Sequence, residues 1–130
     1  MIVVDASVIA TALANDGDEG RCVRKRMTGE RLAAPELLDL EVVSVLRRLC
    51  AAGTLTAERA EAAVVDLHAL RVQRVPHRTL LARCWQLRKN VTVYDAAYIA
   101  LAESLEAPLL TADRRLVGAP GAACEFELME

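Results

Sequence analysis

The sequence predicts an α/β fold, a three-layer α/β/α sandwich with a mostly parallel central sheet. Short apolar segments alternate along the whole chain with longer segments in which apolar residues recur at helical spacing. The chain has 130 residues, the length of one domain, and 54% of them are hydrophobic, which is enough for a buried core. Because the sequence contains no repeat, linker or low-complexity stretch, we expect a single domain over residues 1–130.

Five short segments are predicted strands. Residues 1–4 are apolar and β-branched, which is typical of a strand buried on both faces of a sheet. Residues 31–34 and 72–75 are two short candidates further along the chain. Residues 108–111 are mostly apolar, and residues 124–128 alternate in polarity as a terminal edge strand does.

Six segments between these strands have helical patterns. Apolar residues recur on one face from Pro35 to Ala52, and a proline is tolerated in a first helical turn because its missing N–H would have no partner there. Thr56 is expected to cap the next helix. The predicted helices cover residues 7–15, 18–28, 35–52, 57–69, 77–88 and 94–106.

Composition excludes several classes of protein. Sixteen Lys and Arg stand against 18 Asp and Glu, which gives a formal net charge of −2. A nucleic-acid-binding protein that is basic over its whole surface is therefore excluded, while local basic patches remain open. Aromatic residues make up 3%, too few for a base-stacking platform. With no signal-peptide pattern and no apolar run of about 18 residues, we expect a cytoplasmic protein without a membrane segment.

The four cysteines are widely spaced and form no CxxC pair. Zinc binding is therefore not expected, and the apolar neighbours of each cysteine favour reduced thiols in the core. The cysteines are Cys22, Cys50, Cys84 and Cys124.

Two aspartates follow predicted strands. Asp5 ends the first apolar run, and Asp113 comes two residues after Thr111. In parallel sheets, ligands bind outside the carboxyl ends of the strands, so both aspartates are candidates for a site at that edge. The alternative for each is a structural one, in which the carboxylate caps the helix that follows, which for Asp113 is a short helix at Arg114.

Two more acids lie on apolar helix faces. Glu41 has Leu37, Leu38 and Val45 as helical neighbours, and a lone glutamate there is costly to bury without a partner. It therefore points into a cleft or forms a salt bridge with an arginine. Asp95 opens an alanine-rich helix, where negative charge is favourable in itself, yet it shares a face with residues expected to point inward.

Together the four acids predict a cation site. Crowded carboxylates repel one another and raise their own pKa values, and a divalent cation removes that repulsion. Oxygen ligands without His or Cys favour Mg²⁺ or Mn²⁺.

The sequence resembles the PIN-domain ribonucleases of the VapC type, the toxins of bacterial type II toxin–antitoxin systems. The resemblance covers nearly the whole chain, and it rests on the order and spacing of four blocks rather than on any one of them. The blocks are Val3-Val4-Asp5-Ala6-Ser7, Pro35 with Glu41-Val42, Tyr94-Asp95-Ala96 leading into Tyr98-Ile99-Ala100-Leu101-Ala102-Glu103, and Leu110-Thr111-Ala112-Asp113.

The resemblance implies an Mg²⁺- or Mn²⁺-dependent endoribonuclease that forms a homodimer and is silenced by a cognate antitoxin protein reaching into its active-site groove. Metal-activated water would hydrolyse the phosphodiester bonds of RNA, a step that needs neither His68 nor His77. The implied catalytic and metal-binding residues are Asp5, Glu41, Asp95 and Asp113, with Ser7 and Thr111 as supporting hydroxyls.

Basic residues could meet the phosphates of RNA. Without the four site acids, 14 acidic residues stand against 16 basic ones. Arg114 and Arg115 directly follow Asp113, and arginine suits bidentate contact with phosphate. We therefore interpret these two as candidates for RNA contact.

Three alternatives remain open from the residues alone. A receiver-like phosphotransfer module would need an acidic pair after the first strand, where Asp5 is single. A haloacid-dehalogenase-like phosphatase would need an aspartate in place of Ser7. A catalytically silent PIN-fold binding module would need no acids, whereas all four are present.

Overall fold

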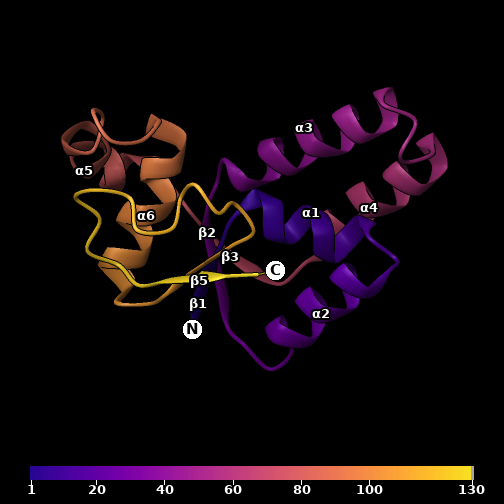
Figure 1. Cartoon of the computed structure of the whole chain (residues 1–130), viewed down its shortest axis with the longest axis horizontal. Helices are drawn as coiled ribbons and strands as arrows, with labels where there is room; N and C mark the ends of the chain where they lie inside the picture. The colour runs from indigo at the N-terminus through magenta and orange to yellow at the C-terminus, as the bar shows by residue number, and fades with distance from the viewer. Residues whose placement is uncertain (130) are drawn as a thin grey trace.

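The computed structural model describes residues 1–129, and its centre is a five-stranded parallel sheet (Figure 1). The strand order is β3-β2-β1-β4-β5, so the first strand of the chain lies in the middle of the sheet. The strands are β1 (Ile2–Val4), β2 (Leu32–Pro35), β3 (Val72–Val75), β4 (Leu109–Thr111) and β5 (Phe126–Leu128).

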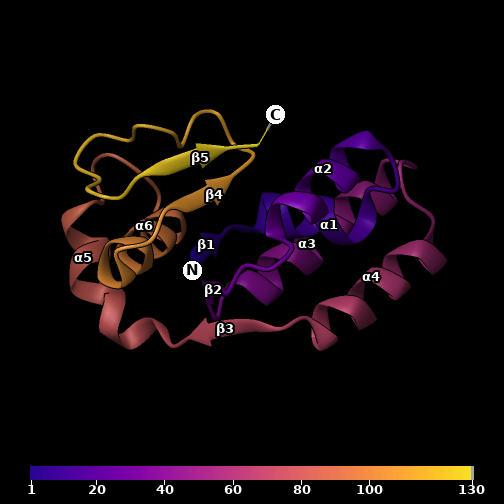
Figure 2. The ribbon, with the colours of Figure 1, turned by 90° about the horizontal axis from the view of Figure 1, so that it is seen from below.

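Helices cover both faces of this sheet, as the three-layer prediction requires. On one face of the sheet α6 packs against β1, β2 and β4, and α5 lies outside α6. On the other face α1 packs with α2, α3 and α4 (Figure 2). The helices are α1 (Ala6–Ala14), α2 (Asp18–Met27), α3 (Leu38–Ala51), α4 (Ala57–Ala69), the 3₁₀ helix η1 (His77–Leu80), α5 (Leu81–Gln86) and α6 (Val93–Leu105).

The core lies on both sides of β1 and β4. Every residue of β1 and β4 is buried, which explains their continuously apolar sequences. Because α6 contributes many small buried side chains to the core, this helix can approach the sheet closely. The small residues are Ala96, Ala97, Ala100 and Ala102.

Pro35 corrects one predicted boundary. It lies in β2, paired with Val75, and α3 begins only at Leu38. The physical reason is that a proline pushes the residue before it, Ala34, into an extended conformation, which prolongs the strand. Thr56 caps α4 as expected, accepting a hydrogen bond from the N–H of Arg59.

Three further expectations are wrong. The segment predicted as one helix over 77–88 is the short 3₁₀ helix η1 followed by α5. The residues after Asp113 form turns rather than a short helix. Of the four cysteines, all of them free, only Cys84 is buried. Cys22 lies on the exposed face of α2, because this polar helix buries Gly20 and Val23 and turns Cys22 toward solvent.

Within residues 1–129 no helix is both long and apolar enough to cross a membrane.

Candidate active site

The four predicted acids line one pocket at the carboxyl edge of the sheet. The pocket has a volume of about 250 Å³ and is bordered by the end of β1, the turn after β4, and the first turns of α3 and α6. All strands are parallel and β1 lies next to β4, so Asp5 and Asp113 reach the same edge from opposite ends of the chain. The acids are Asp5, Glu41, Asp95 and Asp113.

Asp5 is the most buried of the four, with 7% of its surface exposed. It caps α1 by accepting a hydrogen bond of 3.1 Å from the N–H of Val8. The hydroxyl of Ser7 donates to the same oxygen at 2.6 Å, and the hydroxyl of Thr111 donates to the other. Burial raises the pKa of Asp5, although these hydrogen bonds oppose the shift. Capping and pocket lining, which the sequence presented as alternatives, coexist in this residue.

The two supporting hydroxyls also hold the turn after β4. Ser7 Oγ accepts a hydrogen bond from the N–H of Ala112, and Thr111 Oγ1 accepts one from the N–H of Asp113, both at 3.0 Å. Each hydroxyl therefore donates to Asp5 and accepts from the backbone beside Asp113. These contacts connect the two strand ends and fix where their carboxylates lie.

Glu41 is half-buried in the first turn of α3, and its partner is a tyrosine rather than an arginine. The hydroxyl of Tyr98 donates to Glu41 Oε1 at 2.6 Å, and Tyr98 is only 2% exposed. Burial raises the pKa of Glu41, and the charges of Asp95 and Asp5 raise it further. Within residues 1–129 Glu41 forms no ion pair.

Sequence reasoning did not assign Tyr98 to the site. The signal was present, because Tyr98 lies three residues after Asp95 on the same face of α6. Burial and contact with Glu41 also raise the pKa of Tyr98, so this residue remains a hydrogen-bond donor.

Asp95 and Asp113 complete the pocket. Burial raises the pKa of Asp95, and the charge of Asp113 adds to the shift. Asp113 accepts hydrogen bonds from the backbone N–H of Arg115 at 3.0 Å and from its guanidinium at 3.3 Å, so it caps a turn where a short helix was predicted.

Arg115 borders the pocket on the α6 side, where a second hollow is also lined by Arg88 and Lys89. Arg114 is exposed and takes part in an interaction of its own. His77 Nε2 accepts a hydrogen bond from the N–H of Leu37, so that histidine has a structural contact.

The pocket has the chemistry of a hard-cation site. Its acids are carboxylates, which are the ligands that Mg²⁺ and Mn²⁺ prefer. In the part of the chain that the structure describes, no three His, Cys, Asp or Glu side chains are yet grouped so that they could hold a metal ion. The carboxylates are the right type of ligand for such an ion. To bind it, these side chains would have to turn toward one another.

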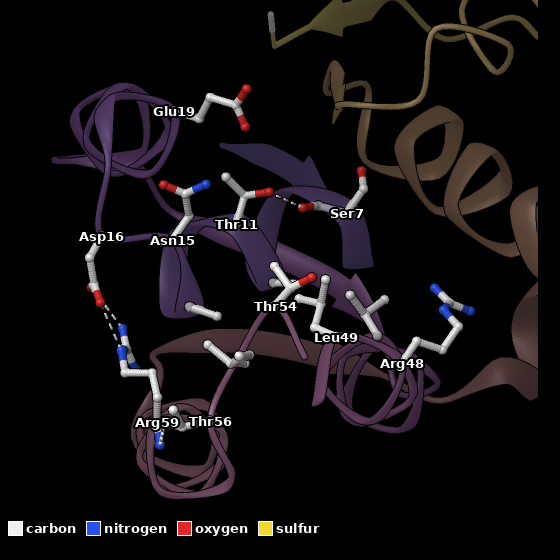
Figure 3. Close-up of a pocket in the computed structure, with 14 residues that line it drawn as sticks. Ser7, Thr11, Asn15, Asp16, Glu19, Arg48, Leu49, Thr54, Thr56 and Arg59 are labelled. Carbon is white, nitrogen blue, oxygen red and sulfur yellow. Dashed lines mark hydrogen bonds and ion pairs between the residues drawn. The ribbon is translucent and has the colours of Figure 1, made fainter. Parts of the chain in front are cut away.

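A larger groove adjoins this pocket on the other side. It has a volume of about 750 Å³ and lies between α1, the C-terminal half of α3, and the start of α4 (Figure 3). We call it the α1 groove. Arg48 and Ser7 lie at one end, where the groove meets the acidic pocket. Arg59, ion-paired with Asp16, closes the other end.

Comparison with known proteins assigns the fold to a family. The family model of the PIN domain matches residues 2–121. The chain is 44% identical over 128 residues to ribonuclease VapC1 of Mycobacterium tuberculosis, covering 98% of this chain and 96% of the relative.

Two solved structures share the fold at low sequence identity. The toxin VapC20 of Mycobacterium tuberculosis, which cleaves the sarcin-ricin loop, matches with a TM-score of 0.70 at 15% identity, over 89% of this chain and 92% of that one. VapBC2 of Rickettsia felis, bound to a DNA fragment from its promoter, matches with a TM-score of 0.70 at 13% identity, over 100% of both chains. The chain belongs to the PIN-domain family, among the VapC ribonucleases.

Proposed function

We propose that this chain, as a single nuclease domain over residues 1–130, is a divalent-metal-dependent endoribonuclease and the toxin of a toxin–antitoxin pair. The observation that carries the proposal is the pocket lined by four carboxylates at the carboxyl edge of the sheet. Three of the four, Asp5, Glu41 and Asp95, form no ion pair with any residue in 1–129, so their charges are left for a cation. The ribonuclease activity in the name of VapC1 supports the same conclusion.

Asp5, Glu41, Asp95 and Asp113 would hold the metal, which we propose to be Mg²⁺ or Mn²⁺. When bound, such an ion activates water for hydrolysis and offsets the negative charge that develops at the phosphate. Ser7 and Thr111 orient the Asp5 carboxylate through both of its oxygens. Tyr98 orients Glu41 from α6 by donating to one carboxylate oxygen, Oε1.

Cleavage in a defined metal buffer tests this proposal. Purified protein should cut single-stranded RNA with Mg²⁺ or Mn²⁺ and lose that activity in a chelator. The fragments should carry a 5′-phosphate and a 3′-hydroxyl, because neither histidine is in the pocket to activate the 2′-hydroxyl. Undiminished cutting in chelator, or a 2′,3′-cyclic phosphate as the primary product, would contradict the proposed chemistry. A complete absence of cutting would favour the catalytically silent module.

The proposed protein partner is a cognate antitoxin, supported by the likeness to the VapBC2 complex and by the family assignment. Co-expression with the neighbouring small reading frame should yield a stable complex in which RNA cleavage is inhibited. The receiver-like and haloacid-dehalogenase-like alternatives are set aside by the family assignment.

We also propose a homodimer. Several large apolar side chains are exposed around α5 and the start of α6, where a second copy could cover them. Sedimentation of the isolated chain should give a dimer, and a monomer at all concentrations would contradict this. The exposed residues are Leu81, Trp85, Val93 and Tyr94.

A further inference from the structure

We propose that Arg48 binds a backbone phosphate of single-stranded RNA beside the acidic pocket. This inference rests on the proposed ribonuclease function and identifies where the substrate enters the site. Arg48 lines both the acidic pocket and the α1 groove, so it lies where the two hollows meet.

The helix geometry of α3 places Arg48 at this boundary. Glu41, Ser44 and Arg48 are spaced by three and four residues, and all three line the acidic pocket. One stripe of α3 therefore runs from the proposed metal-binding carboxylate to the guanidinium. The adjacent Arg47 projects about 100° away around the helix and lines neither hollow.

The side chain of Arg48 is exposed and lacks a partner among residues 1–129, for it forms no hydrogen bond or ion pair with them. The other arginines at the pocket margins are engaged. Arg115 is paired with Asp113, Arg88 lies over the ring of Trp85 at 4.1 Å, and Arg59 is paired with Asp16 at the far end of the groove. Figure 3 shows Arg48 extended near Ser7, apart from the Arg59–Asp16 pair.

Electrostatics explains why a substrate contact is needed here. Four ionised carboxylates, the guanidinium of Arg115 paired with Asp113, and one divalent cation leave a net charge of about −1 at the pocket, which still repels a polyanion. A guanidinium next to the pocket offsets that repulsion and can grip a phosphate through two hydrogen bonds. Because Arg48 is exposed and has no partner among residues 1–129, no contact with them has to be broken.

The experiment compares Arg48→Ala with Arg47→Ala, a matched loss of one exposed arginine from the same helix. We expect Arg48→Ala to raise the KM for a short single-stranded RNA by about tenfold with little change in kcat, because one charge-assisted contact is lost before the chemical step. The slope of log(kcat/KM) against log salt should decrease in magnitude by roughly 0.7, the value for one phosphate contact on a single strand. Arg47→Ala should behave as wild type.

A substrate series locates the contact. Replacing the linkages of the RNA one at a time by uncharged methylphosphonate should reveal one linkage, outside the cut site, that weakens binding to wild type and Arg47→Ala but has no effect with Arg48→Ala.

Equal KM values and salt slopes for the two variants would overturn the inference while leaving ribonuclease activity standing. That result would also be found if Arg48 contacts only a protein partner. If wild type neither binds nor cuts RNA, the proposed function fails together with the inference. Circular dichroism melts should be the same for all three proteins, because Arg48 is exposed and unpaired within residues 1–129.

Discussion

Helix α6 carries two acids in opposite environments. Near its start, Asp95 faces the pocket, and burial and the charge of Asp113 raise its pKa. Two turns later, Glu103 binds Arg83 through both oxygens, at 2.7 and 3.0 Å, and accepts a hydrogen bond from the N–H of Ala123. These contacts lower the pKa of Glu103.

The difference shows what each end of the helix contributes. The Glu103 end is stabilised by a completed ion pair that joins α5 to α6 and reaches the carbonyl of Gly121. At the Asp95 end, like charges gather, and among residues 1–129 only Asp113 of the four acids has a cationic partner, Arg115, so the folded protein carries much of that repulsion.

The largest expected effect comes from removing charge at the pocket end. Asp95→Asn should reduce RNA cleavage by at least about 100-fold, because a proposed metal ligand is lost. Its unfolding free energy without metal should stay equal or rise, since one repelling charge is gone. Cleavage assays and urea melts measure the two effects. The control is Glu103→Gln on the same helix, which should lose stability and retain activity; the reverse outcome would break the comparison.

The second-largest expected effect is at the Glu103 end of α6. Arg83→Ala should lower the unfolding free energy by about 2 kcal/mol, because Glu103 stays largely buried without its cation. The loss should shrink as the pH falls below the ordinary pKa of glutamate, since protonated Glu103 no longer needs that cation. Arg78→Ala removes an exposed arginine from η1 and should change stability by less than about 0.5 kcal/mol. Equal melts for the two variants would contradict the assigned role of the pair.

Tyr98→Phe sharpens the comparison by removing the neutral partner of Glu41. The ring should still fill the core, whereas the Glu41 carboxylate loses the donor that orients it. We expect about tenfold weaker activation by Mn²⁺ and a stability loss of about 1 kcal/mol. Metal titrations of cleavage and calorimetric binding measure the first effect. Tyr94→Phe, on the exposed face of the same helix, should match wild type in both.

The smallest effect concerns pH. Because the pKa of Asp5 is raised in the folded chain, the metal-free protein binds a proton there more tightly than the unfolded chain does. Its unfolding free energy should therefore fall as the pH rises above about 4, through the folded pKa of Asp5. Asp5→Asn can keep the cap and removes this dependence, so its advantage in chelator should grow between about pH 4 and pH 7. Urea melts at several pH values measure the difference in unfolding free energy between Asp5→Asn and wild type. A difference that stays constant with pH would contradict the raised pKa of Asp5.

Much of the fold follows from local patterns. Alternating apolar strands and amphipathic helices predict the layers, and the parallel-sheet rule brings Asp5 and Asp113 to one edge. Pairings between distant residues could not be predicted. The contact of Glu41 with Tyr98 and the ion pair of Arg83 with Glu103 depend on how α3, α5 and α6 pack, which a single sequence does not encode locally. The boundary at Pro35 failed because proline suits both a first helical turn and a strand end.

The central position of β1 has a consequence during protein synthesis. Ile2–Val4 is made more than a hundred residues before its neighbour β4, and Thr111 must arrive before it can hold Asp5. A nascent chain therefore carries Asp5 and Glu41 without the carboxylate of Asp113 while the residues between Glu41 and Asp113 are made. The four carboxylates therefore gather in one pocket only after β4 has been made and has paired with β1.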